Sequence, residues 1–245
     1  MLVIEEIAYT YAGGAGVSGV SLNVAAGRVA GLVGPNGAGK STVLRCCLGL
    51  QRPQRGRVRL LTPTGTLAAD SIAARRCIGY IPELPVLFDD LSAWDHLRFL
   101  GMAYDLPEAR FRARAEELLR RFGLWERRFD DPFRFSKGML QKLSIICALL
   151  HDPAVILCDE PLSGLDAISR QELLQIFTRL KGEGKAILLC THHLAAAEQL
   201  CDHYLLLHQG QVLVAGDLAA IRERAAAPGA SLETCFLRLA AGAPA

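Results

Sequence analysis

The stretch that most constrains the fold is "GPNGAGKST", Gly34 to Thr42, which fits the pattern G-x-x-x-x-G-K-[ST]. It follows the apolar run Val29 to Val33 and opens a helical pattern at about Gly39. In this setting the glycines let a loop wrap closely, and the backbone N–H groups from Gly37 to Ser41 can cradle phosphates at a helix N-terminus. The pattern therefore predicts a phosphate-binding loop between a buried strand and a helix.

Short apolar runs alternate with helical spacing along most of the chain. This alternation predicts an α/β fold, a mostly parallel sheet flanked by helices on both faces. At the start, Leu2 to Ala8 and Val20 to Val24 look antiparallel and predict an N-terminal β lobe. The later strand-like runs are Ile78 to Ile81, Val155 to Cys158, Ala186 to Cys190 and Tyr204 to Leu207.

Residues 88–151 differ in character, because apolar residues recur there at helical spacing with no strand signal. We expect a helical lobe inserted into the sheet domain, and its arginines fit a solvated helix face better than an anion site. The main domain is expected to span residues 1–224. Residues 225–245 are expected to form a linker, a short amphipathic helix in "SLETCFLRL", and a frayed end in "AAGAPA".

Composition limits the function classes. A formal net charge of +2 over 245 residues gives no strong basic field, so general binding to nucleic acid or anionic membrane has little support. The eight cysteines contain no C-x-x-C pair, which favours buried thiols in a reducing cytoplasm over a disulfide framework, with zinc binding as the lesser alternative. The start is acidic, and no apolar run approaches the roughly 18 residues of a membrane span, so we expect a soluble chain without a signal peptide.

Two adjacent carboxylates end the apolar run of "VILCDEP", Val155 to Pro161. In P-loop proteins an acid at the end of a later buried strand meets the Mg²⁺ that bridges the phosphates, which predicts that role for Asp159. Glu160 points elsewhere, because neighbouring side chains diverge at a strand end, and it suits a general base for the attacking water. In the loop itself, Lys40 would reach the β- and γ-phosphates and the Ser41 hydroxyl would bind Mg²⁺.

Further motifs follow in a fixed order. "FSKGM", Phe135 to Met139, places Ser136 as the N-cap of a long apolar-periodic helix just before the acid pair. With the phosphate loop and the acid pair, these segments resemble the ATP-binding subunit of an ABC transporter over nearly the whole chain. "SKGM" and the C-terminal "SLETCFLRL" resemble the subgroup that drives ABC-2-type exporters. The other matching segments are "IGYIPE" (78–83, the Q-loop), "SGLD" (163–166, the D-loop) and "TH" (191–192).

The resemblance implies a role for each matching residue. Tyr11 would stack on adenine, although it also fits a plain strand residue. His192 would contact the γ-phosphate and orient Glu160 and water, and Asp166 would reach the partner subunit. Metal ligands would be Ser41, Asp159 and Glu83. The implied ATP-binding set is Tyr11, Gly34, Pro35, Asn36, Gly37, Ala38, Gly39, Lys40, Ser41 and Thr42.

The resemblance also implies partners. Two such subunits, identical or different, would face each other head to tail, and each ATP would lie between one phosphate loop and the Ser136, Lys137 and Gly138 signature of the other. Cofactors would be ATP and Mg²⁺. A separate membrane permease would be the driven partner, nucleic acid would not be one, and the subunit would be cytoplasmic, peripheral on the cytoplasmic face of the cell membrane.

Three motifs depart from the common family pattern. Lys137 stands in place of the first signature glycine, with Met139 in place of its glutamine. Glu83 replaces the usual glutamine, which leaves its part in metal contact open. Gly164 replaces a frequent alanine, a change expected to matter little.

Two alternative functions remain open at this stage. A soluble ABC protein acting on ribosomes or DNA would carry two cassettes in one chain, or long coiled coils between Ser41 and Ser136, and neither is evident. A P-loop small-molecule kinase would have no use for the signature helix or for Glu160 as a water base.

Overall fold

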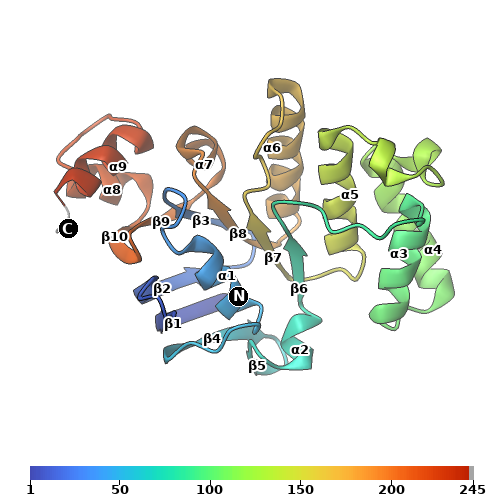
Figure 1. Ribbon diagram of the computed structural model, residues 1–245, viewed down its shortest axis with the longest axis horizontal. Helices are drawn as coiled ribbons and strands as arrows, with labels where there is room; N and C mark the ends of the chain where they lie inside the picture. Colours follow the sequence, from blue (N-terminus) through green and yellow to red (C-terminus); the bar gives the residue numbers. More distant parts are fainter. Residues whose placement is uncertain (243–245) are drawn as a thin grey trace.

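The computed structural model describes residues 1–242, which form a ten-stranded sheet with helices packed on it (Figure 1). Five parallel strands form its centre, so the predicted α/β fold is confirmed. They lie in the order β9 (His203–His208), β3 (Val29–Val33), β8 (Ala186–Thr191), β7 (Val155–Asp159) and β6 (Ile78–Ile81).

An antiparallel lobe continues the sheet from β10 (Gln211–Gly216), which pairs with β9 and touches β2. The strands of this lobe are β2 (Gly16–Val24), β1 (Leu2–Thr10), β4 (Arg55–Thr62) and β5 (Gly65–Ala68). Its first two strands were expected. The strands β4, β5 and β10 were not.

The central strands are buried on both faces, which explains their unbroken apolar runs. Along β7, Ile156 and Cys158 join one core cluster, while Val155 and Leu157 join another on the opposite face. The first cluster includes α5 (Lys137–Leu149) and α6 (Ala167–Gly182), and the second includes α1 (Lys40–Cys47) and the β lobe. The sheet is thus covered by helices on one side and by α1 with the β lobe on the other.

The helical lobe consists of α3 (Ala93–Ala103), α4 (Glu108–Arg121) and the neighbouring α5, with two short 3-10 turns at Trp125–Arg127 and Pro132–Arg134. Three of the α4 arginines pair with acids on the same helix: Arg112 with Glu108, Arg114 with Glu117 and Arg120 with Glu116. They therefore form the ion-paired solvated face that was expected.

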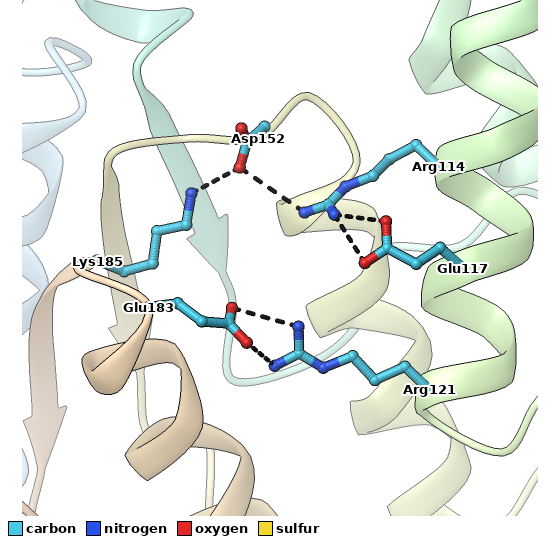
Figure 2. Close-up of polar contacts among 6 residues, drawn as sticks. All are labelled: Arg114, Glu117, Arg121, Asp152, Glu183 and Lys185. Atoms are coloured by element: carbon cyan, nitrogen blue, oxygen red, sulfur yellow. Dashed lines mark hydrogen bonds and ion pairs between the residues drawn. The ribbon is translucent and has the colours of Figure 1, made fainter.

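Ion pairs join this lobe to the sheet domain (Figure 2). Arg121 of α4 lies 2.7 Å from a carboxylate oxygen of Glu183, which follows α6. Asp152, after α5, accepts a 2.6 Å hydrogen bond from Lys185 and lies 3.7 Å from Arg114 of α4. The lobe is therefore attached at the base of β7 and β8, away from the carboxyl ends of the strands.

The C-terminal part forms a third cluster around β9 and β10, built by α7 (Leu194–Leu200), α8 (Leu218–Arg224) and α9 (Leu232–Ala241). The predicted short C-terminal helix is α9. It includes Ala240 and Ala241, so the expectation that these residues fray was wrong, and the rest of that expectation, residues 243–245, lies outside the described residues. A short helix, α2 (Ile72–Arg75), precedes β6.

All eight cysteines are free; five are buried and three are partly exposed. Within residues 1–242, no helix has both the length and the apolar character that a membrane crossing requires.

Candidate functional site

The site lies where the adjacent parallel strands β3, β8 and β7 end at one edge of the sheet. The loop from Gly34 follows β3, His192 follows β8, and Asp159 ends β7. The next strand, β6, leads to Glu83. Because carboxyl ends of neighbouring parallel strands meet at the same edge, four segments far apart in the sequence form one site.

Lys40 and Glu160 form a buried ion pair in this structure. Each side chain is 6% exposed, and the Lys40 Nζ lies 3.1 Å from Glu160 Oε1. The same ammonium donates to the carbonyl oxygens of Gly34 at 2.8 Å and Pro35 at 3.1 Å. The Lys40 side chain therefore folds back onto its own loop. In this structure the Glu160 carboxylate neutralises the Lys40 charge, which bound phosphates would otherwise neutralise.

Glu160 is held from both sides. Its backbone has a φ of 46°, in the left-handed region, and its N–H donates to the Cys190 carbonyl at 2.9 Å. Its Oε2 accepts the His192 N–H at 3.2 Å and lies 2.9 Å from His192 Nδ1. Burial would raise the pKa of Glu160, but the hydrogen bonds from His192 and the Lys40 charge outweigh it and lower the pKa. The carboxylate is thus ionised and oriented by His192.

Asp159 points away from Glu160, as expected, and accepts a 3.2 Å hydrogen bond from the Ser41 hydroxyl. Burial raises the pKa of Asp159, and the negative charges of Glu160 and Glu83 raise it further. The carboxylates of Asp159 and Glu83 and the Ser41 hydroxyl supply hard oxygen ligands at this point. These residues fit a divalent cation such as Mg²⁺.

A pocket of about 300 Å³ lies over these groups. Tyr11 reaches it just past the end of β1, so the plain-strand alternative does not hold for this residue. The Tyr11 hydroxyl accepts from Thr42 at 3.4 Å and from Arg45 at 3.3 Å. The predicted residues that line the pocket are Tyr11, Asn36, Gly37, Gly39, Lys40, Ser41, Thr42, Glu83, Asp159 and Glu160.

Sequence reasoning missed two residues here. Arg45 lies on α1 one turn after Ser41, so helical spacing alone would have placed it on the pocket side. His193 offers a nitrogen within 4.8 Å of ligand atoms of Glu160 and His192, a grouping that resembles a metal site. Because the Lys40 ammonium already lies 3.1 Å from Glu160, its charge opposes a divalent cation at that point.

The predicted signature residues lie outside the pocket; Ser136 and Lys137 are exposed, and Gly138 is buried. Ser136 is the N-cap of α5 and accepts from the Met139 N–H at 3.3 Å. Asp166 is the N-cap of α6 and accepts from the Ser169 N–H at 2.9 Å. The chain therefore holds two separate sets of residues, one around the phosphate loop and one at the starts of α5 and α6.

Comparison with known proteins gives the family. The family model described as "ABC transporter" matches residues 17–163. The ABC-type transporter ATP-binding protein EcsA of Bacillus subtilis (strain 168) is 37% identical over 98% of this chain and 96% of its own length. This chain belongs to the ABC transporter family. It is an ATP-binding subunit with ATPase activity, as this fold and these relatives have in common.

Other matches of this ABC subunit agree. The ABC transporter ATP-binding protein NatA of Bacillus subtilis (strain 168) is 36% identical over 84% of each chain. A solved structure described as the ATP binding subunit of an ABC transporter is 39% identical, with a TM-score of 0.87, covering 98% of this chain and 99% of that one. Membership of this family argues against the small-molecule kinase.

Proposed function

We propose that this subunit forms a head-to-tail dimer around MgATP, with an identical or a related chain, and that ATP cleavage in the dimer drives a separate membrane permease. The observation that carries the proposal is the separation of the two residue sets. The phosphate-loop pocket and the exposed starts of α5 and α6 lie apart in one copy. A second copy turned head to tail brings one set of each chain against the other.

The chemistry then follows from the geometry. Bound phosphates draw the Lys40 ammonium away from Glu160, because several phosphate oxygens together carry more negative charge than the Glu160 carboxylate and the Gly34 and Pro35 carbonyls. The freed Glu160 carboxylate, held in place by His192, accepts the proton of the attacking water. Mg²⁺, when bound by Ser41, Asp159 and Glu83, supplies positive charge that offsets the charge of the phosphates.

A second surface supports a permease partner. An apolar groove of about 390 Å³ runs between the segment after β6 and helices α3 and α5. Val86 and Phe88 on one wall and Phe99 on the other are exposed. Because exposed apolar surface of this kind marks interaction sites, the groove suits a permease segment that presents apolar side chains.

Export is the proposed direction, and the cytoplasmic face of the membrane the proposed location. The Nod factor export ATP-binding protein I of Ralstonia nicotianae (strain ATCC BAA-1114 / GMI1000) is 35% identical over 88% of this chain and 67% of its own length. A solved structure of cbiO1 from Clostridium perfringens, described as part of the ABC transporter complex cbiONQ, has a TM-score of 0.77 at 28% identity and covers 88% of each chain. Both relatives are named for export or for a transporter complex, which favours a permease over the ribosome or DNA as partner.

The Glu160→Gln variant tests the dimer. Without the carboxylate base, ATP hydrolysis should fall by about a hundredfold or more, while ATP and Mg²⁺ should double the mass measured by light scattering. Lys40→Ala should bind ATP far more weakly and remain a protomer. Normal hydrolysis by Glu160→Gln would remove Glu160 from the base role, and a protomer at saturating MgATP, even with permease present, would overturn the proposal.

A further inference from the structure

Helix α7 connects His192 to the C-terminal helices. It begins directly after His192 and His193, and it lies between α6 and the α8–α9 pair (Figure 1). His192 is the residue that orients Glu160, through its backbone N–H at 3.2 Å and its Nδ1 at 2.9 Å. The orientation of Glu160 therefore depends on where α7 starts.

The start of α7 is held only locally. His193 occupies the N-cap position, and in the described part of the chain its side chain makes no capping hydrogen bond. The His193 N–H donates to the hydroxyl of the buried Thr191 at 3.0 Å. Because that contact spans only two positions of the chain, the direction of the helix has to be fixed further along it.

Glu198 joins α7 to both C-terminal helices. Its Oε2 accepts a 2.9 Å hydrogen bond from the N–H of Leu232, the first residue of α9, and its Oε1 accepts from Arg222 of α8 at 3.3 Å. Arg222 is itself held, because its Nε donates to the Ala230 carbonyl at 2.7 Å. The side chains of Glu198 and Arg222 are 26% and 31% exposed, so water screens this pair only in part. One carboxylate with both oxygens occupied thus connects three helices.

The far end of α7 is fixed to the sheet. Tyr204 of β9 is 2% exposed, and its hydroxyl donates to the carbonyl of Cys201, directly after α7, at 3.0 Å. Ala197 is fully buried in the core cluster that α7, α8 and α9 share. Without the Glu198 contacts, α7 would keep its attachment at the Tyr204 end and could shift at the end that carries His192.

We propose that Glu198 is a positioning residue for ATP hydrolysis: by fixing α7 to α8 and α9, it keeps His192 where His192 orients Glu160. The inference rests on the proposed role of Glu160 as the base. Because a misplacement of about 1 Å caused by a distant mutation can slow a reaction by about a hundredfold, a less firmly held α7 slows hydrolysis. ATP binding is not affected, since the phosphate loop lies between β3 and α1.

Ser231→Ala is the matched control, because the start of α9 has two separate acceptors. The Ser231 hydroxyl accepts from the Thr234 N–H at 3.2 Å, while Glu198 accepts from Leu232. Both Ser231→Ala and Glu198→Ala should lower the unfolding temperature by a few degrees, as the loss of a helix cap does. Well below both unfolding temperatures, only Glu198→Ala should lower kcat, by about tenfold, with the Kd for ATP unchanged. Equal kcat values of the two variants would overturn the inference.

A second comparison tests whether Glu198 acts through the base. In the Glu160→Gln background the carboxylate that His192 orients is missing, so adding Glu198→Ala should leave the residual rate of phosphate release nearly unchanged. If the two losses multiply instead, Glu198 acts by another route and the inference is overturned. Normal hydrolysis by Glu160→Gln alone would contradict the proposed function, so the failure of the base and the failure of Glu198 are distinguishable.

Discussion

At the scale of single residues, the nucleotide-free site is held together by opposite charges that the reaction must later separate. Lys40 and Glu160 are both buried and lie 3.1 Å apart. Removing one partner of such a pair leaves the other charge buried without compensation. Lys40 and Glu160 would therefore stabilise the nucleotide-free protein through their ion pair. When phosphates take the place of Glu160 at Lys40, Lys40 would bind the phosphates and Glu160 would act as the base.

This pairing predicts a stability effect in the absence of nucleotide. Lys40→Met should lower the free energy of unfolding by about 3 kcal/mol, because Glu160 then keeps only its His192 contacts in a buried site. Urea unfolding without nucleotide measures the change. The double variant with Glu160→Gln should lose less than the sum of the single losses. Unfolding of Lys40→Met at the wild-type urea concentration would show that the pair does not form in solution.

The structure brings most of the residues expected around the phosphate loop to one pocket, but the sequence did not indicate their contacts. The phosphate loop and the acid pair are short sequence motifs, so the roles of their residues can be predicted from the sequence. The link from Lys40 to Glu160 spans 120 positions and depends on strand order, which no local pattern contains. Likewise, Asp166 was expected to reach a partner subunit, whereas in the single chain its carboxylate caps α6. A carboxylate exposed on a loop can serve either purpose.

At the scale of elements, the junction between α5 and β6 contains a half-buried histidine. His151 follows α5, stacks on Tyr104 at 3.8 Å between ring centroids, and its Nε2 lies 3.0 Å from the Ile78 carbonyl of β6, where an N–H can donate. Burial lowers the pKa of His151 to about 4, while the nearby charges of Asp152 and Lys185 act in opposite directions. The neutral ring is therefore part of the packing between helix and sheet.

The shift predicts a dependence of stability on pH. Between about pH 6.5 and 4 the unfolded chain binds a proton at His151 that the folded chain does not, so stability is complete above pH 6.5 and falls as the pH drops to 4. The loss attributable to His151 should be on the order of 2 kcal/mol. His151→Gln keeps a donor for Ile78 but cannot titrate, so urea unfolding at pH 7 and pH 4.5 should differ less for this variant. An unchanged difference would rule out His151 as the source.

Element types were easier to predict than the full set of elements. Strands buried on both faces, such as β7 and β8, stood out as apolar runs, and α9 stood out by its helical spacing. β4 was missed because arginines alternate with its apolar residues, a pattern that fits one buried face only. β10 was missed because it forms a hairpin with β9 through Gln209 and Gly210, both at positive φ, rather than following a helix.

At the scale of the whole molecule, the two proposed interaction surfaces are separate. The exposed starts of α5 and α6 would meet a second copy, while the apolar groove between the β6 loop and α3 would meet the permease. Glu83 lies between the nucleotide pocket, which it lines, and the groove, which Pro85 and Val86 line two and three residues later. A change at the nucleotide can therefore reach the groove through only a few residues of backbone.

This arrangement predicts that permease contact can be lost without loss of ATP binding. Val86 is 77% exposed at the groove, and an aspartate there would place a charge in an interface that is apolar when docked. The share of tagged Val86→Asp protein that sediments with membranes containing the permease should fall by about tenfold or more. Leu237→Asp is the matched control, since Leu237 is 61% exposed on α9, away from the groove.

Both variants should bind ATP as the wild type does, because neither residue lines the nucleotide pocket. Equal sedimentation of the two variants would mean that the permease does not bind this groove. The segment after Glu83 would then not connect the nucleotide pocket to the permease.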